Sequence, residues 1–286
     1  MSRIAYVNGR YLPHRDASVH IEDRGYQFAD GVYEVCEIFG GMIVDETRHL
    51  NRLERSLREL AIRMPMGRTA LRVVIREVVR QNRVRDGLVY LQVTRGVARR
   101  DHSFPSPDTQ PALVVTAKSI SRAKGDALAA EGVAVITLPD NRWARVDIKS
   151  IGLLPNAIAK QKAKEAGARE AWFVDRDGFV TEGSSTTAWI VTKEGVLVTR
   201  PNGTDILPGI TRVTATEVAR RQGLKVEERK FTVEEAKAAR EAFITAASTI
   251  VIPVVRIDGA PVANGHPGSI AGQLRAAFHD VAEKLP

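Results

Sequence analysis

The sequence has only one cysteine, Cys36, among its 286 residues. A single thiol excludes an internal disulfide framework and a zinc site with several cysteine ligands. Long apolar runs are also missing, since none approaches the roughly 20 residues that a membrane-spanning helix needs. Residues 1–6 lack the apolar core of a secretory signal. We therefore expect a soluble, cytoplasmic protein.

Aromatic residues are few, at 6% of the chain, whereas apolar residues make up 44% and charged residues 27%. These fractions are typical of a folded protein and argue against disorder, collagen-like repeats and coiled coil. The 42 basic and 34 acidic residues give a net charge of +8, which raises the remote alternative of a nucleic-acid or anion-binding protein. The basic excess lies mainly between Arg48 and Arg100, where arginines recur at helical spacing opposite aliphatic residues. That pattern favours solvated helix faces instead.

The first part of the chain reads as short strands followed by two helices. Gly40-Gly41 lies between two β-rich runs and predicts a hairpin. Amphipathic spacing predicts helices over 47–63 and 68–83. Strands at 88–96 and 112–118 are expected to follow, because both runs are rich in β-branched residues.

The second part mixes short strands with helices expected at 156–166, 210–222 and 268–284 and a helical turn near 232–239. Between the two parts, Ser119–Gly132 is small, polar and charged, which is typical of a linker. Regular βαβ alternation is missing, so the fold class expected is α+β (mixed α/β) rather than a doubly wound sheet. We expect two domains, residues 1–118 and 133–286, joined by a linker at 119–132.

Several common catalytic motifs are missing. The chain has no G-x-G-x-x-G dinucleotide fingerprint, Walker phosphate loop, H-E-x-x-H zinc motif or G-x-S-x-G nucleophile elbow. Its six histidines are scattered without metal-ligand spacing. Rossmann-type hydride transfer, P-loop phosphoryl transfer and metal-dependent hydrolysis are therefore not expected, and no metal site is expected.

Four segments concentrate polar residues where strands and helices should meet. They are R-G-Y-Q-F-A-D-G-V-Y-E at 24–34, R-W-A-R-V-D-I-K-S at 142–150, T-E-G-S-S at 181–185 and L-P-G-I-T-R at 207–212.

Lys149 is the candidate reactive amine, because apolar residues flank it on both sides. A lysine in apolar surroundings loses its charge more readily and can act as a nucleophile or base; the alternative is a strand-end lysine that reaches solvent. The helix expected to begin at Ile210 offers backbone N–H groups and the Thr211 hydroxyl to a phosphate, although it can equally be a plain helix start. With the isolated carboxylate Glu182, these features suggest a phosphorylated aldehyde cofactor.

In this order the four segments resemble the class IV aminotransferases, the pyridoxal-phosphate enzymes of fold type IV, and within them the D-amino-acid aminotransferases. The resemblance runs roughly from Tyr6 to Ile257. It implies a small N-terminal α/β sandwich, a larger C-terminal pseudo-barrel domain and pyridoxal 5'-phosphate as cofactor.

The resemblance also implies a role for individual residues. Lys149 would form the Schiff base with the cofactor and carry the proton between the substrate Cα and the cofactor C4′. Glu182 would keep the pyridine nitrogen protonated, which makes the ring an electron sink, and Arg142 would support Glu182. The remaining expected contacts are Arg52, Ile210, Thr211 and the backbone of Ala246 and Ala247 for the phosphate, Leu207 for the ring, and Tyr33 for the substrate.

One segment departs from the family pattern. The D-amino-acid enzymes commonly place hydroxyl residues against the phosphate, whereas this chain has Ala246 and Ala247. Backbone N–H groups can still bind the phosphate there. Each missing neutral hydrogen bond is expected to weaken cofactor binding by roughly 1 kcal/mol.

The loop after strand 88–96 indicates the substrate class. Arg100-Asp101-His102 resembles the carboxylate-binding residues of the D-amino-acid aminotransferases, with a guanidinium fork suited to a carboxylate. In that family a dimer partner contributes this loop, so a homodimer is implied. The expected reaction moves the amino group of a D-amino acid such as D-alanine to a 2-oxo acid such as 2-oxoglutarate by a ping-pong mechanism. A branched-chain L-amino-acid or (R)-amine transaminase of the same fold is the alternative.

Overall fold

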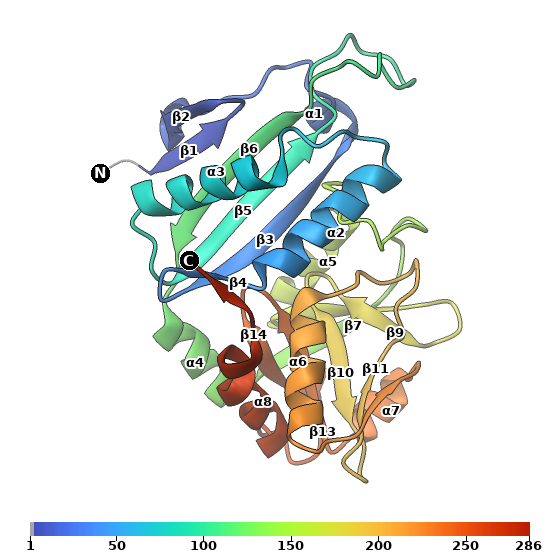
Figure 1. Cartoon of the computed structure of the whole chain (residues 1–286). Coiled ribbons are helices and arrows are strands. Elements are labelled where there is room, and N and C mark those ends of the chain that lie inside the picture. Colours follow the sequence, from blue (N-terminus) through green and yellow to red (C-terminus); the bar gives the residue numbers. More distant parts are fainter. Residues whose placement is uncertain (1–2) are drawn as a thin grey trace. The chain divides into compact units, whose positions relative to one another are not determined.

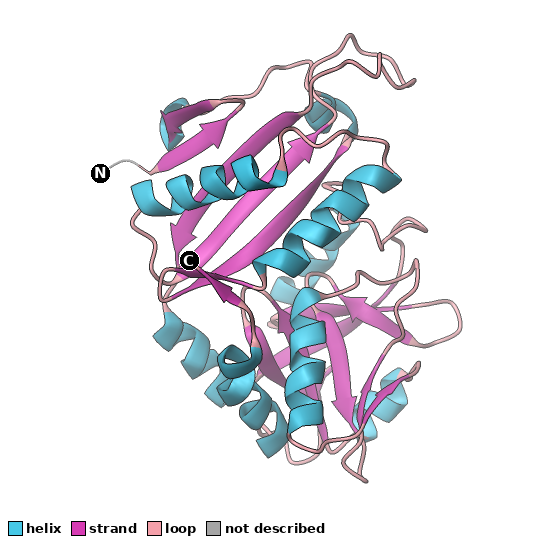
Figure 2. Cartoon of the chain, in the orientation of Figure 1, coloured by secondary structure: helices cyan, strands magenta, loops and turns pink. Residues whose placement is uncertain are grey.

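The computed structural model describes residues 3–286, which form two compact units. The N-terminal unit comprises the residues through Ser121 together with Ile148–Gly152 and Glu283–Pro286. The C-terminal unit comprises Arg122–Asp147 and Leu153–Ala282. In each unit helices lie against a sheet (Figures 1 and 2). None of the helices in residues 3–286 has both the length and the apolar character that crossing a lipid bilayer requires.

An antiparallel sheet forms the centre of the N-terminal unit. Its seven strands are β1 (Ile4–Val7), β2 (Arg10–Pro13), β3 (Gly31–Phe39), β4 (Met42–Val44), β5 (Gly87–Thr94), β6 (Ala112–Ser119) and β16 (Lys284–Leu285). Their order is β16-β4-β3-β5-β6-β1-β2. The longest pairing joins β3 to β5, from Gly31 opposite Thr94 to Ile38 opposite Gly87.

Two helices, α2 (Glu46–Glu59) and α3 (Arg68–Gln81), pack on this sheet against β3 and β6 (Figure 1). The helices predicted at 47–63 and 68–83 are therefore present, but they end four and two residues earlier. Their apolar stripes are fully buried, which is what the amphipathic spacing requires. The buried stripes are Leu50, Leu53 and Leu57 on α2 and Leu71, Ile75 and Val78 on α3.

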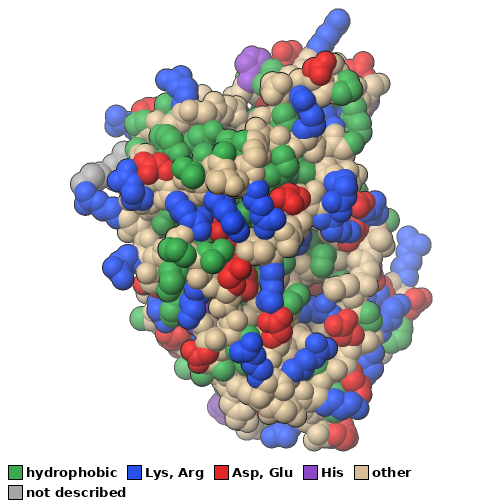
Figure 3. Space-filling model, viewed as in Figure 1, with side chains coloured by type: hydrophobic (Ala, Val, Ile, Leu, Met, Phe, Trp, Pro, Cys, Tyr) green, Lys and Arg blue, Asp and Glu red, His purple; other side chains and the backbone are tan. Residues whose placement is uncertain are grey.

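The arginines of α3 are matched by carboxylates. Arg72 and Arg76 both pair with Glu46, and Arg80 pairs with Glu77. About a third of the Arg72 and Arg76 side chains is exposed. On the face shown in Figure 3, basic side chains lie among acidic and apolar ones. These contacts agree with the solvated helix face expected from the arginine spacing.

The C-terminal unit contains a larger, mixed sheet in the order β12-β11-β10-β13-β14-β7-β8-β9, with β15 paired to β14. Its parallel pairs are β14 with β7, β7 with β8 and β11 with β12. The strands are β7 (Val133–Pro139), β8 (Glu170–Val174), β9 (Val180–Gly183), β10 (Thr187–Val191), β11 (Leu197–Thr199), β12 (Val226–Glu228), β13 (Glu241–Ala246), β14 (Ile250–Ile257) and β15 (Ala260–Pro261).

The helices of this unit are α4 (Arg122–Glu131), α5 (Leu154–Glu165), α6 (Ile210–Arg221), α7 (Val233–Ala238) and α8 (Ser269–Val281). Four of them were expected. The fifth, α4, occupies the segment interpreted as a linker, because its small and charged composition hides a good helix former rich in alanine. Leu128 and Ala129 of α4 pack against the core of the C-terminal unit.

The unit boundaries differ from the predicted domains in two further places. Ile148–Gly152 and Glu283–Pro286 belong to the N-terminal unit although they lie far along the chain. The first segment pairs with the start of β3, and the second forms β16 beside β4. Such pairing depends on backbone contacts between distant segments, which composition does not reveal.

Cys36 yields a test of the N-terminal core. It lies on β3 with 1% of its surface exposed. Burial, followed by the nearby charges of Glu34 and Glu46, raises the pKa of the thiol well above its ordinary value of 9.0. Because the thiolate is the reactive form, we expect no reaction with a thiol-specific disulfide reagent at pH 8 until denaturant unfolds the protein. Fast stoichiometric labelling of the native protein would show that β3 is not in the core.

Candidate active site

The segment that carries Lys149 is fixed by the start of β3. The Tyr33 N–H donates to the Lys149 carbonyl at 3.0 Å, and the Ile151 N–H donates to the Gly31 carbonyl at 3.0 Å. Gly31 is required at this point because a Cβ there would lie 2.7 Å from the Val93 carbonyl oxygen of β5. The Lys149 N–H also donates to Ser56 Oγ at 3.3 Å. The main chain of Lys149 is therefore held from two sides.

The side chain of Lys149 is half-buried and lies against Tyr33. Its Nζ is 4.1 Å from the centroid of the Tyr33 ring, within the range of a cation–π contact. Tyr33 in turn stacks on Tyr90, with ring centroids 5.7 Å apart. Burial and the neighbouring Tyr33 raise the pKa of Tyr90 to about 12. The predicted reactive amine and the predicted substrate-side tyrosine are therefore neighbours in the N-terminal unit.

Arg52 of α2 is bound to a carboxylate in the core. Its Nε and Nη2 donate to Glu34 Oε1 and Oε2 at 2.7 and 2.8 Å, and His49 Nδ1 lies 2.7 Å from Glu34 Oε2. Burial alone would raise the pKa of Glu34, but the Arg52 charge and the hydrogen bonds from Arg52 and His49 lower it to about 2. The structure thus fixes the position of Arg52, while its role in phosphate binding stays a prediction.

Arg100 and His102 gather around Phe28 at the end of α1 (Arg24–Phe28). The Arg100 Cζ is 4.8 Å from the Phe28 ring centroid, and the rings of His102 and Phe28 are 5.5 Å apart. Arg24 anchors the loop because its Nη1 donates to the Asp101 carbonyl at 2.6 Å. Both predicted carboxylate-binding side chains are exposed. The arrangement presents two nitrogen-donor groups from one apolar ring, which suits a carboxylate.

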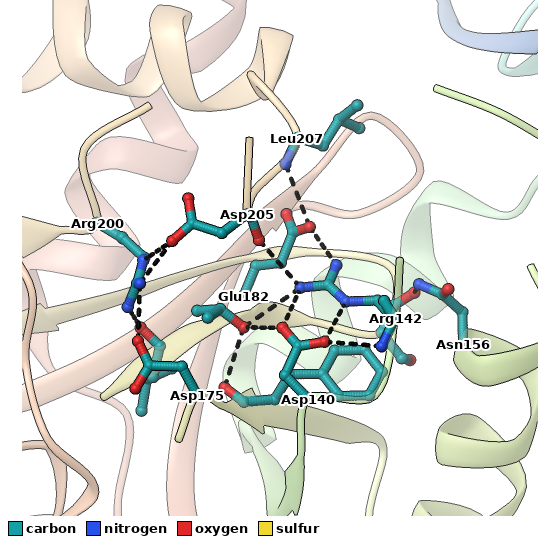
Figure 4. Close-up of polar contacts among 12 residues, drawn as sticks. Asp140, Arg142, Asn156, Asp175, Glu182, Arg200, Asp205 and Leu207 are labelled. Atoms are coloured by element: carbon teal, nitrogen blue, oxygen red, sulfur yellow. Dashed lines mark hydrogen bonds and ion pairs between the residues drawn. The ribbon is translucent and has the colours of Figure 1, made fainter. Parts of the chain in front are cut away.

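Glu182 lies on β9 in the C-terminal unit, with 6% of its surface exposed. Arg142 Nη1 donates to Glu182 Oε1 at 2.5 Å, so the expected contact between these two residues is present (Figure 4). The Leu207 N–H donates to the same oxygen at 3.2 Å. The carboxylate and the predicted ring-packing residue Leu207 are therefore adjacent.

Arg142 is held by partners that the sequence did not reveal. Asp140 accepts from Arg142 Nε and Nη2 at 2.9 and 2.7 Å. Arg142 Nη2 also approaches Thr181 Oγ1 and donates to the Asp205 carbonyl. The guanidinium lies over the Phe173 ring, 4.5 Å from its centroid. The one sequence signal for Asp140 is its i,i+2 spacing to Arg142, since the Arg142 N–H closes a turn on Asp140 Oδ1.

The predicted phosphate residues of this unit lie on adjacent elements. Helix α6 begins at Ile210 after Gly209, where a Cβ would lie only 2.7 Å from Thr187 Oγ1. Thr187 of β10 is opposite Thr245 of β13, which leads directly into Ala246 and Ala247. The start of α6 and the end of β13 therefore converge.

This convergence fits a phosphate. The first N–H groups of an α-helix have no partner within the helix and favour an anion. Close to Ala246 and Ala247, the Thr249 hydroxyl is buried without a hydrogen-bond partner among residues 3–286. Thr249 was missed in the sequence, where only the two alanines drew attention to this turn.

The candidate residues divide between the two units. Lys149, Tyr33, Arg52, Arg100 and His102 belong to the N-terminal unit. Glu182, Leu207, Ile210, Thr211, Ala246 and Ala247 belong to the C-terminal unit.

Comparison with known proteins identifies the class of enzyme. Residues 31–257 match the family described as amino-transferase class IV. The chain therefore belongs to the class IV aminotransferases, and the predicted family is confirmed. It is 42% identical to a D-alanine aminotransferase of Bacillus licheniformis over 273 residues, which cover 96% of this chain and 95% of that one. A D-alanine aminotransferase of Staphylococcus aureus (strain COL) is 39% identical, with 97% of both chains covered.

Solved structures agree on the fold. A branched-chain amino acid aminotransferase from T.th., solved with pyridoxamine 5'-phosphate, has a TM-score of 0.90 and 26% identity, covering 98% of this chain and 94% of that chain. The branched-chain enzyme from Escherichia coli has a TM-score of 0.89 at 22% identity, with the same coverage, and shows the fold alone. The mixed α/β fold expected from the resemblance is confirmed.

The Glu34 cluster predicts a specific acid sensitivity. Because the pKa of Glu34 is lowered from 4.5 to about 2, its contribution to the free energy of unfolding is complete above the higher value and is lost as the pH falls toward the lower one. Glu34→Gln should cost about 3–5 kcal/mol at pH 7 and flatten the decline of stability in that acid range. Urea unfolding across a pH series measures both effects.

The exposed Glu131→Gln is the matched control, and it should leave the unfolding free energy and its pH profile close to those of the parent protein. An unchanged acid slope in Glu34→Gln would contradict the ion pair.

Proposed function

We propose that the protein is a pyridoxal-phosphate-dependent transaminase that moves the amino group of a D-amino acid such as D-alanine to a 2-oxo acid such as 2-oxoglutarate. Its membership of the class IV aminotransferases and the two D-alanine aminotransferases among its relatives support this proposal. The structural observation that carries the substrate class is the meeting of Arg100 and His102 on the Phe28 ring. A guanidinium and an imidazole so placed would bind the substrate carboxylate.

The residues of the chain fit this cofactor. Lys149 would hold it covalently, Glu182 would face the ring nitrogen and Leu207 would pack on the ring. When bound, pyridoxal phosphate supplies an electron sink for the electrons released at the substrate Cα. The phosphate would bind Arg52, Ile210, Thr211 and the backbone of Ala246 and Ala247. The narrow approach at Gly209 and the buried Thr249 hydroxyl beside this loop support the phosphate assignment.

The protein side of the chemistry is proton movement and orientation. The Lys149 amine, fixed through its main chain by Tyr33 and Ser56, would take the Cα proton from the substrate and return it on the other carbon of the transfer. Tyr33 would orient that amine through its ring. Holding these groups in a fixed geometry lowers the entropic part of the barrier.

A branched-chain L-amino-acid transaminase is the second candidate, because solved branched-chain enzymes share the fold at TM-scores of 0.89 and 0.90. An (R)-amine transaminase of the same fold remains a further alternative. Assembly as a homodimer and a cytoplasmic location also stay predictions.

D-Alanine and L-leucine distinguish the first two candidates. In the purified protein loaded with pyridoxal phosphate, D-alanine should bleach the visible absorption band of the cofactor, and L-leucine should leave it unchanged. Addition of 2-oxoglutarate should then restore the band and form D-glutamate. Bleaching by L-leucine alone would move the protein to the branched-chain group, and bleaching by an (R)-amine without a carboxylate would favour the third alternative.

Two substitutions separate cofactor binding from substrate binding. Lys149→Ala should lose the covalently held cofactor and all turnover. Arg100→Ala should keep the visible band but raise the KM for D-alanine about 10- to 100-fold, because a charge-assisted bond worth about 1.5–3 kcal/mol is lost. Arg99→Ala is the matched control, since Arg99 is an exposed arginine of the same loop. Equal effects of the two arginine substitutions would show that Arg100 has no special role.

A further inference from the structure

The carboxylate of Glu182 lies directly against a charged arginine. Only 3% of the Arg142 side chain and 7% of the Glu182 side chain are exposed at their contact. In a buried site an opposite charge at this distance strongly offsets the field of a carboxylate. An isolated Arg142–Glu182 pair would therefore have little net negative charge to offer a protonated ring nitrogen.

Asp140 places a second negative charge on the same guanidinium. Its two oxygens accept from Arg142 Nε at 2.9 Å and from Nη2 at 2.7 Å (Figure 4). The Thr181 hydroxyl donates to Asp140 Oδ2 at 2.8 Å. Burial alone would raise the pKa of Asp140, but the hydrogen bonds and charge of Arg142 outweigh it and lower that pKa. Asp140 is thus anionic at neutral pH.

The charged groups next to this cluster balance one another. Arg200 pairs with Asp175 at 2.8 Å and with Asp205 at 2.5 Å (Figure 4). Lys230 Nζ lies 3.9 Å from Asp175. These two cations and two carboxylates carry no net charge together. The cluster of Asp140, Arg142 and Glu182 has one cation and two carboxylates, so one negative charge remains.

We propose that Asp140 is a positioning residue that compensates Arg142, so that Glu182 keeps the net negative charge needed to hold the pyridine nitrogen of the cofactor in its protonated form. Arg142 orients Glu182 by a hydrogen bond, and Asp140 prevents that bond from cancelling the charge of Glu182. The proposal rests on the proposed function, in which Glu182 faces the ring nitrogen.

The ring nitrogen itself can be observed in pyridoxal phosphate labelled with ¹⁵N and bound to the protein. In the parent protein the ¹⁵N NMR signal should show a protonated nitrogen at neutral pH. Asp140→Asn keeps the size of the side chain but removes its charge. We expect the midpoint at which the nitrogen loses its proton to fall by about 1–2 pH units, a tenfold or larger loss of proton affinity.

A double variant distinguishes charge compensation from a structural role. In Asp140→Asn/Arg142→Gln the uncompensated cation is gone as well, so Glu182 again carries a net negative charge. The midpoint should return to within about half a unit of the parent value, since opposite charges near a titrating group shift it in opposite directions. A purely structural role of Asp140 predicts the opposite, because the double variant removes more contacts than the single one.

Two further variants serve as controls. Asp140→Glu retains the charge and should keep the nitrogen protonated. Asp258→Asn removes a similar carboxylate from the same unit, one that bonds the Thr137 hydroxyl and pairs with Lys237, and it should leave the midpoint unchanged.

The outcomes decide between the possibilities. A lowered midpoint in Asp140→Asn together with recovery in the double variant supports the proposal. An unchanged midpoint in Asp140→Asn, or a midpoint as low in the double variant as in the single one, overturns it. If Asp140→Asn does not fold, the double variant decides alone, because a protonated nitrogen supports the proposal and an unprotonated one overturns it. A parent protein that binds no pyridoxal phosphate would overturn the proposed function, and this proposal with it.

Discussion

The pairing of Ile148–Gly152 with the first residues of β3 is the constraint on which the candidate chemistry depends. It fixes the main chain of Lys149 before the side chain makes any contact, through the N–H of Tyr33 and the hydroxyl of Ser56. Successive residues of a strand point to opposite faces. Tyr33 therefore meets the lysine on one face of β3, while Glu34 enters the helix-covered core on the other and holds Arg52.

Both units use a buried arginine tied to carboxylates, but with different charge balance. In the N-terminal unit Arg52 meets the single carboxylate of Glu34, with His49 as a further donor, so the cluster carries no net negative charge to offer a ligand. In the C-terminal unit Arg142 lies between two carboxylates, Asp140 and Glu182. The first arrangement suits a structural support near an anion, and the second suits a site for a cation such as a protonated ring nitrogen.

The sequence predicted most of this architecture where the pattern is local. Leucines at helical spacing predicted α2 and α3, and the residues of T-E-G-S-S and L-P-G-I-T-R lie on the strand β9 and at the start of the helix α6. It failed where the answer depends on distant segments. Asp140 looks like an ordinary turn residue until Arg142 closes on it. The alanine-rich α4 was interpreted as a linker because nothing local shows the core that buries Leu128.

The same long-range dependence appears at the first turn of α2. The N-cap residue of this helix, Asp45, makes no side-chain capping bond. Instead the Thr47 N–H donates to Glu283 Oε2 at 2.8 Å, and the Asp45 N–H donates to the Glu283 carbonyl at 2.9 Å. Glu283 lies 236 positions after Thr47. During synthesis on the ribosome, the helix that carries Arg52 therefore waits for its cap until the whole C-terminal unit has been translated, so the N-terminal unit is the first to start folding and the last to finish.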